Sequence, residues 1–285
     1  TGEETNNPPA NTVAIGSDFS PDSDGEVLLV LAGRQRQRLA GEEVEVIHAP
    51  GGQVRVNARV TREDAPSGVR VDAEPFNHLI VPAGKRSSVT FPDGSRVWVN
   101  AGSHLWYPVE WKEDRREVFI EGEIFVDAAR DTARPFVVTT GLLEIEVLGT
   151  RFNVTARDAS ANAVVLERGS VRVRTPRREE VLLVPDQRLE YRGGELSVGR
   201  VETRQYTAWK DGLLYFNGTP LGEILARLGN YYGREIAYDN AGAELTCSGT
   251  LELKATVEEV LEGLTHTVPV RVVRVRGNIH VINTP

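Results

Sequence analysis

The segment VTFPDGSRVWV, residues 89–99, alternates apolar and polar side chains on both sides of a short turn. Pro92 and Asp93 favour the turn, and Gly94 supplies the positive φ that closes it. Val97 and Val99 then point to one face of the second strand, because side chains alternate along an extended chain. The segment therefore predicts a β-hairpin with one apolar face.

The same period of two continues from Glu26 to about Val201. Short alternating runs bounded by Gly, Pro, Asp or Asn indicate strands rather than helices. The connections are too short for crossover helices, which favours mostly antiparallel pairing. We therefore expect an antiparallel β-sandwich or a rolled, β-solenoid-like domain. Besides the hairpin, the predicted strands cover residues 27–31, 44–46, 54–56, 69–71, 118–126, 136–139, 143–148, 152–156, 163–167, 171–174, 181–184 and 188–191.

The pattern changes after Tyr206, where two stretches carry apolar residues at i, i+3, i+4 and i+7, the stripe of an amphipathic helix. These stretches are residues 221–228 and 257–264. Thr219 is the predicted N-cap of the first helix, and Pro220 its first residue. Thr256 and Glu259 predict a capping box on the second. Strands are expected around both helices, at residues 213–216, 235–238, 246–251, 270–275 and 278–282, so two βαβ-like units should form one small two-layer domain.

The expected fold class is therefore mainly β with a small α+β carboxyl-terminal domain. The predicted parts are a polar, Pro-rich linker at 1–25, an amino-terminal β extension at 26–75, a β domain at 76–203 and the βαβ-repeat domain at 206–285. No stretch is apolar enough over about 20 residues to span a bilayer. Because the chain starts at Thr1 and contains no methionine, we expect it to be a piece of a longer product, with the linker leading to a membrane anchor.

Composition argues against several classes of function. A formal net charge of −8 and a pI near 5.3 disfavour nucleic-acid binding, which usually leaves a basic footprint. Cys247 is the only cysteine, so the chain can form neither an internal disulfide nor a thiolate metal cluster. We expect Cys247 to be a small apolar residue in a strand.

The search for catalytic chemistry finds no strong motif. There is no phosphate-binding glycine loop, and the five histidines lack metal-ligand spacing, so we expect each of them at the surface or at a sheet edge. Glu117, Glu121 and Glu123 share one face of a predicted strand, which favours a solvated face over the carboxylate pair of a hydrolase. No enzyme activity, catalytic residue, metal or cofactor is therefore expected.

A second class of function comes from four aromatic residues that lie close together in the sequence. They are Trp98, Trp106, Tyr107 and Trp111. Such a cluster either packs between a sheet and a loop or forms a platform on which a sugar ring stacks. The alternative to a regulator is thus a secreted or surface glycan-binding β protein.

An ordered set of segments resembles the FecR family of anti-sigma regulators over roughly residues 80–285. The segments are Val81–Arg86, Pro92–Ser95, Val97–Ser103, Arg115–Val118, Glu121–Glu123, Phe125–Val126, Arg134–Val138, Val147–Val154, Glu167–Val171 and Thr207–Gly212. Each segment alone is weak, whereas their shared order is specific. Residues 26–75 are similar, more loosely, to the β extension that precedes the FecR domain in some members.

The resemblance implies the periplasmic part of a single-pass inner-membrane anti-sigma factor of a Gram-negative bacterium. It implies that the signal comes from the N-terminal signalling domain of a TonB-dependent outer-membrane transducer. A cytoplasmic segment and a membrane helix, both missing from this chain, would pass the signal to an extracytoplasmic-function sigma factor. The repeated βαβ end resembles the small signalling domains of secretins and of these transducers.

We expect the partner to contact the last predicted strand. An exposed sheet edge accepts a strand from another protein through main-chain hydrogen bonds. The predicted contact residues are Asn278, Ile279, His280, Val281 and Ile282.

Overall fold

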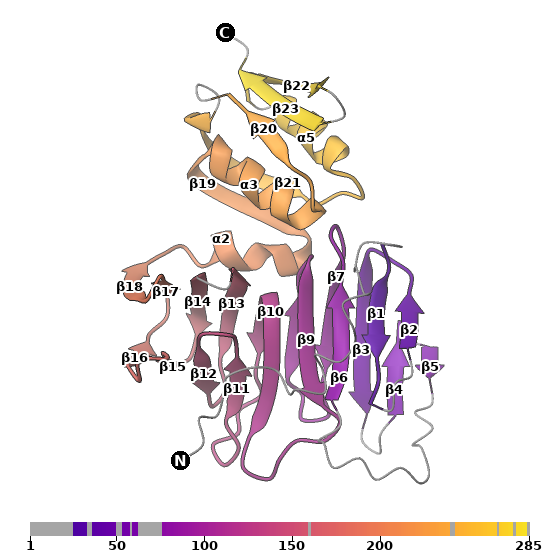
Figure 1. Cartoon of the computed structure of the whole chain (residues 1–285), viewed down its shortest axis with the longest axis vertical. Coiled ribbons are helices and arrows are strands. Elements are labelled where there is room, and N and C mark those ends of the chain that lie inside the picture. Colours follow the sequence, from indigo (N-terminus) through magenta and orange to yellow (C-terminus); the bar gives the residue numbers. More distant parts are fainter. Residues whose placement is uncertain are drawn as a thin grey trace. The chain divides into compact units, whose positions relative to one another are not determined.

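The structure is a computed structural model that describes residues 25–32, 36–49, 53–57, 59–61, 76–158, 161–239, 243–266, 268–275 and 278–283. The chain divides after Thr203 into two compact units, called here the first and the second unit. Figure 1 shows strands dominating the first unit and helices with short sheets in the second. The predicted strand at 69–71, and the predicted linker apart from Gly25, lie outside the described residues.

The first unit is built from strands. In chain order they are β1 (Val27–Val30), β2 (Arg36–Leu39), β3 (Glu43–Ala49), β4 (Gln53–Val56), β5 (Arg59–Thr61), β6 (Phe76–Val81), β7 (Arg86–Thr90), β8 (Arg96–Val99), β9 (Ser103–Pro108), β10 (Arg116–Asp127), β11 (Phe136–Thr139), β12 (Glu144–Val147), β13 (Arg151–Asp158), β14 (Ala161–Arg168), β15 (Val171–Arg174), β16 (Glu180–Leu183), β17 (Gln187–Arg192) and β18 (Glu195–Arg200). The predicted hairpin is β7–β8, and Gly94 has φ +87° in its turn.

These strands form two long sheets. One sheet has the order β2-β1-β6-β9-β10-β11-β12-β15-β16, and the other has the order β5-β4-β3-β7-β8-β10-β13-β14-β17-β18. Pairing is antiparallel except for β10–β11 and β3–β7. The predicted mainly β class with mostly antiparallel pairing is confirmed, and of the two predicted arrangements the two sheets correspond to the sandwich. The early strands β1–β5 complete the same two sheets as the later ones.

Strand β10 belongs to both sheets and crosses between them at Gly122. Residues 116–121 pair with β9 and β11, whereas residues 122–127 pair with β8 and β13. Gly122 has φ +106°, and a Cβ atom built on it would lie 2.3 Å from the Ser103 hydroxyl oxygen. Only glycine fits this crossing, because any other residue would be strained and would collide with β9.

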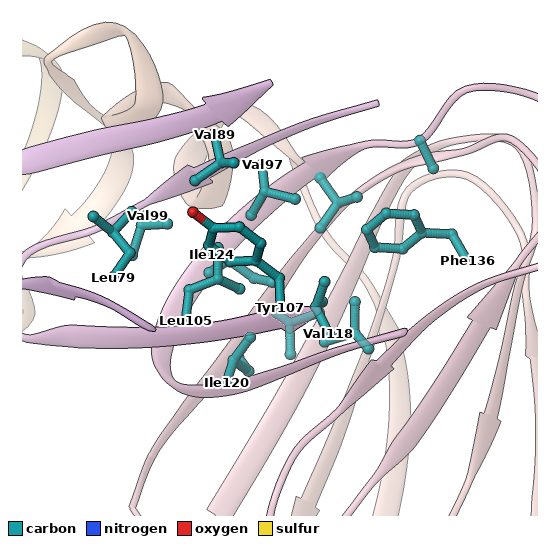
Figure 2. Close-up of a cluster of buried hydrophobic side chains, with 14 of the residues drawn as sticks. Leu79, Val89, Val97, Val99, Leu105, Tyr107, Val118, Ile120, Ile124 and Phe136 are labelled. Carbon is teal, nitrogen blue, oxygen red and sulfur yellow. The ribbon is translucent and has the colours of Figure 1, made fainter. Parts of the chain in front are cut away.

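One apolar core fills the space between the sheets. Figure 2 shows Tyr107 of β9 pointing into a cluster that includes Val97 of β8 and Ile124 of β10. The inward residues come from alternate positions of both sheets, as the period of two predicts. Burial of this face is the main source of stability for the first unit.

The second unit combines helices with two small sheets. Its elements are the short helix α2 (Arg204–Thr207), the 3₁₀ turn η1 (Ala208–Asp211), β19 (Leu213–Pro220), α3 (Leu221–Tyr232), β20 (Ile236–Tyr238), β21 (Thr246–Glu252), α5 (Val257–Thr265), β22 (Val270–Val275) and β23 (Asn278–Asn283). The predicted strand–helix–strand order therefore occurs twice. No helix in the described part of the chain has the length and apolar character needed to cross a bilayer.

Both predicted helices form, and each buries its predicted apolar stripe. The capping box of Thr256 and Glu259 is present on α5, and Gly233 ends α3 with φ 62°. The predicted N-cap at Thr219 is wrong: Pro220 is the N-cap, and α3 begins at Leu221. The reason is that β19 remains paired with β21 up to Pro220, so Pro220 itself is extended (φ −57°, ψ 137°) and the helix begins one residue later than predicted.

Candidate functional site

The two strand–helix–strand repeats of the second unit share their strands between two sheets. The first strands of the repeats, β19 and β21, pair with each other in antiparallel fashion. The second strands, β20 and β22, lie on either side of β23, with β20 parallel to it and β22 antiparallel. Each repeat thus links one sheet to the other, and the apolar stripes of α3 and α5 are buried in the unit.

The predicted edge position of β23 is wrong. Its two sides pair with β20 and β22, so its main-chain hydrogen-bonding groups already have partners and no further strand can be added to it. Sequence order misled the prediction, because the last strand in the chain need not be the outermost strand in the sheet. Ile279 and Val281 are also buried, whereas His280 and Ile282 are half-buried on the opposite face.

A groove lies along β21 and is lined by residues from both faces of that strand. It has a volume of about 270 Å³ and is lined by Phe216, Ile224, Leu245, Thr246, Cys247, Ser248, Gly249, Thr250, Leu251, Leu264, Val268 and Pro269. Seven of these residues, 245–251, are consecutive, so the main chain of β21 forms one wall. Its floor is apolar and contains Phe216, Ile224 and Leu264, which come from β19, α3 and α5.

Most side chains of β21 are exposed, although the strand borders a groove with an apolar floor. Thr246, Ser248 and Thr250 are exposed, and only Cys247 and Leu251 are half-buried. One side of β21 pairs with β19, and within the described residues no strand pairs with the other side. Cys247 lies in a strand as predicted, and burial raises the pKa of its thiol. The groove therefore combines an open strand edge with an apolar floor.

In the first unit, a buried arginine gathers several of the segments that carry the family resemblance. The Arg116 side chain is fully buried, and its Nη1 donates to the Asp93 carboxylate at 2.6 Å. Nη1 also donates to the Ala129 carbonyl, while Nε donates to the Arg134 carbonyl. Ser95 Oγ completes the set at 3.2 Å from Nη1. Arg116 thus ties the β7–β8 turn to the chain that leads into β11.

A second polar cluster surrounds Glu123, where β10 enters the other sheet. The Glu123 carboxylate accepts from Asn100 Nδ2 at 2.9 Å and from Asn153 Nδ2 at 3.0 Å, and it pairs with Arg157 at 3.3 Å. Glu117 accepts from Thr139 instead, on the first sheet. The predicted solvated face is correct for exposed Glu121. Glu123 is instead held in a structural network that joins β10 to β13 and to Asn100, the residue that follows β8.

The outer face of β6 and β9 carries an aromatic cluster that the sequence analysis missed. His78 stacks on Trp106 with ring centroids 4.4 Å apart, and His78 Nε2 lies 3.2 Å from His104 Nδ1. Burial, and secondarily the charge of His104, lowers the pKa of His78 to about 3, and burial also lowers the pKa of His104. The predicted surface position is therefore wrong for His78, which is 6% exposed.

His48, on β3, is half-buried rather than fully exposed. His48 Nε2 is hydrogen-bonded to the Tyr107 hydroxyl at 2.9 Å, and burial lowers the pKa of His48 to about 4.

The sequence does carry one signal that strands around His78 are buried on both faces. The apolar run Val27–Val30 lacks alternation, and it forms β1, which pairs with β6. In the described residues, no group of three or more His, Cys, Asp or Glu side chains is arranged to hold a metal ion.

The four aromatic residues considered for glycan stacking do not form one platform. Tyr107 is buried in the core, while its neighbour Trp106 faces the opposite side of β9. Trp98 lies on the other sheet, where Arg96 stacks over its ring at 4.6 Å. Trp111 packs against Phe91 and Phe136. These contacts favour the packing interpretation over a sugar platform.

Two solved structures share the fold of this chain. A crystal structure of a "putative anti-sigma factor" from Parabacteroides distasonis ATCC 8503 at 1.65 Å is 32% identical, covers 73% of this chain and 99% of its own, and has a TM-score of 0.61. A second structure with the same description at 2.50 Å is 31% identical, covers 74% and 100%, and also has a TM-score of 0.61. The fold is thus that of an anti-sigma regulator.

Family models identify the family itself. A model described as "FecR protein" matches residues 78–172, and one described as "FecR, C-terminal" matches residues 213–282. No curated protein matches the chain. The chain belongs to the FecR family of anti-sigma factors, which confirms the resemblance found in the sequence.

Proposed function

We propose that this chain is the periplasmic sensor region of a transmembrane anti-sigma factor. It receives a signal from the N-terminal signalling domain of a TonB-dependent outer-membrane transducer, and the whole protein relays that signal to an extracytoplasmic-function sigma factor. Membership of the FecR family supports the regulatory part of the proposal. The groups that carry the chain's function are then contact surfaces rather than reacting groups.

The observation that carries the proposal is the construction of the second unit. It forms a compact unit of its own, and one side of β21 has no strand partner among the described residues. Main-chain groups at such an edge form hydrogen bonds with a partner strand as readily as with a neighbouring strand of the same sheet. In this proposal residues 206–285 receive the partner, while residues 26–75 and the FecR domain at 76–203 form the scaffold.

Calorimetry tests the proposal directly. The full chain is titrated with the purified signalling domain of a TonB-dependent transducer from the same bacterium, and with the signalling domain of an unrelated nutrient system as a control. We expect saturable binding to one of the transducers of that bacterium, with a Kd in the micromolar range or tighter. If none of its transducer domains binds at 100 µM, on the order of the weakest useful affinity, the proposal fails.

The half-buried residues His280 and Ile282 of β23 remain candidate contacts through their side chains. The double substitution H280D/I282D places charge on that face without touching β21. If this variant loses affinity while substitutions on β21 do not, the outer face of the β20-β23-β22 sheet is the receiving surface.

A further inference from the structure

Strands β19, β20, β21 and β22 each have one side without a strand partner among the described residues, and they differ in how well they suit a partner. β19 ends at Pro220, which has no N–H to donate. β20 has three residues, which is too short for a stable addition. β22 carries exposed Arg271 and Arg274, and charged side chains on an edge discourage pairing with another chain. β21 is seven residues long, and its exposed side chains are the small, neutral Thr246, Ser248 and Thr250 together with Glu252 at its end.

The centre of β21 lacks a side chain. Gly249 lies opposite Phe216 in the β19–β21 register, so both residues belong to the same face of this small sheet. A Cβ atom built on Gly249 would have no neighbour within 4 Å. Since Phe216 is buried and also lines the groove, Gly249 leaves a notch above an apolar floor.

The volume of the groove defines the occupant. A space of about 270 Å³ with Ile224 and Leu264 in its floor accommodates one or two apolar side chains rather than a helix. An extended strand places every second side chain on one face, and these side chains enter such a groove while the main chain pairs with an edge. Val268 and Pro269 also line the groove.

We infer that the groove along β21 receives an extended strand of the transducer's signalling domain, with an apolar side chain of that strand seated in the notch at Gly249. The inference rests on the proposed function and adds to it the receiving surface and the chemistry of the ligand. The added strand continues the β19–β21 sheet and covers Cys247, which lines the same groove.

Cys247 provides a direct test, because it is the only cysteine of the chain. The rate of Cys247 alkylation by a maleimide is measured on the full chain with and without saturating signalling domain, at pH 8 because burial raises the pKa of the thiol. We expect at least tenfold slower alkylation in the complex. If calorimetry shows binding and the alkylation rate is unchanged, the groove is not the receiving surface although the proposed function stands.

The affinity of two Cys247 variants and one control variant for the signalling domain also tests whether the groove is the receiving surface. C247W fills the groove and is expected to weaken binding at least tenfold, while C247S, which keeps the size of the side chain, stays within twofold of the parent chain. E235W, at an exposed position outside the groove lining, serves as the control for a bulky aromatic residue. If C247W is folded by circular dichroism and binds like the parent, the inference is wrong. If no signalling domain binds the parent chain, the proposed function and the inference both fail.

Discussion

The buried Arg116–Asp93 pair gives the sharpest prediction about stability. The Arg116 guanidinium is fully buried, and the carboxylate of Asp93 at 2.6 Å has only 13% exposure. Removing one member of a buried pair leaves the other charge without compensation, which costs about 3–5 kcal/mol. D93A should therefore destabilise the first unit by about 3–5 kcal/mol and lower its melting temperature by roughly 6–20 °C.

The double-mutant cycle separates charge pairing from packing. R116M removes the guanidinium but keeps most of the apolar stem of the side chain. The Asp93 carboxylate that then lacks its partner lies close enough to the surface to be rehydrated. We expect D93A/R116M to be more stable than the sum of the single changes implies, with a coupling energy of about 2 kcal/mol.

Tryptophan fluorescence during guanidinium unfolding is a suitable assay, since Trp98, Trp106 and Trp111 report on the first unit and only Trp209 on the second. Two results would refute the claim that this buried charge pair connects the β7–β8 turn to the segment before β11. One is that the free-energy changes of D93A and R116M add up to that of the double variant, and the other is that D93A costs less than about 1 kcal/mol.

Three further outcomes follow from the structure. Because His78 has its pKa lowered to about 3, it stays neutral in the folded state while the unfolded chain takes up a proton below about 6.5, so stability falls as the pH drops. Between pH 7.5 and pH 5, H78L should lose about 2 kcal/mol less than the parent in guanidinium unfolding, and equal losses would contradict this. G122A should cost about 3 kcal/mol or prevent folding, whereas the matched control G141A, whose Cβ would have no neighbour within 4 Å, should change stability by less than about 1 kcal/mol. T256A removes the capping box of α5 and should raise amide exchange in that helix by an amount equal to about 1 kcal/mol, while unchanged exchange would argue against the cap.

Much of the fold could be predicted from local pattern. The hairpin at 89–99, the two helical stripes and the capping box of Thr256 depend on neighbouring residues, and the structure has all of them. Alternation also predicts which residues of a strand share a face. These features are fixed within about ten residues of chain, where sequence and conformation are most closely linked.

The features that were missed depend on which strand lies next to which. β23 is central because β20 pairs with it across more than 35 residues of chain, and no local signal shows that pairing. The passage of β10 from one sheet to the other is marked only by Gly122, which many kinds of turn would also explain. The groove likewise arises from β19, α3, β21 and α5 together, so its lining could not be read from any one segment.

Hydrogen–deuterium exchange of the full chain, with and without the transducer's signalling domain, tests the central claim most directly. The claim predicts that binding slows exchange in the second unit, most strongly at residues 246–252 of β21, and leaves the two sheets of the first unit unchanged. Protection confined to the first unit, with β21 exchanging as fast in the complex as in the free chain, would contradict it.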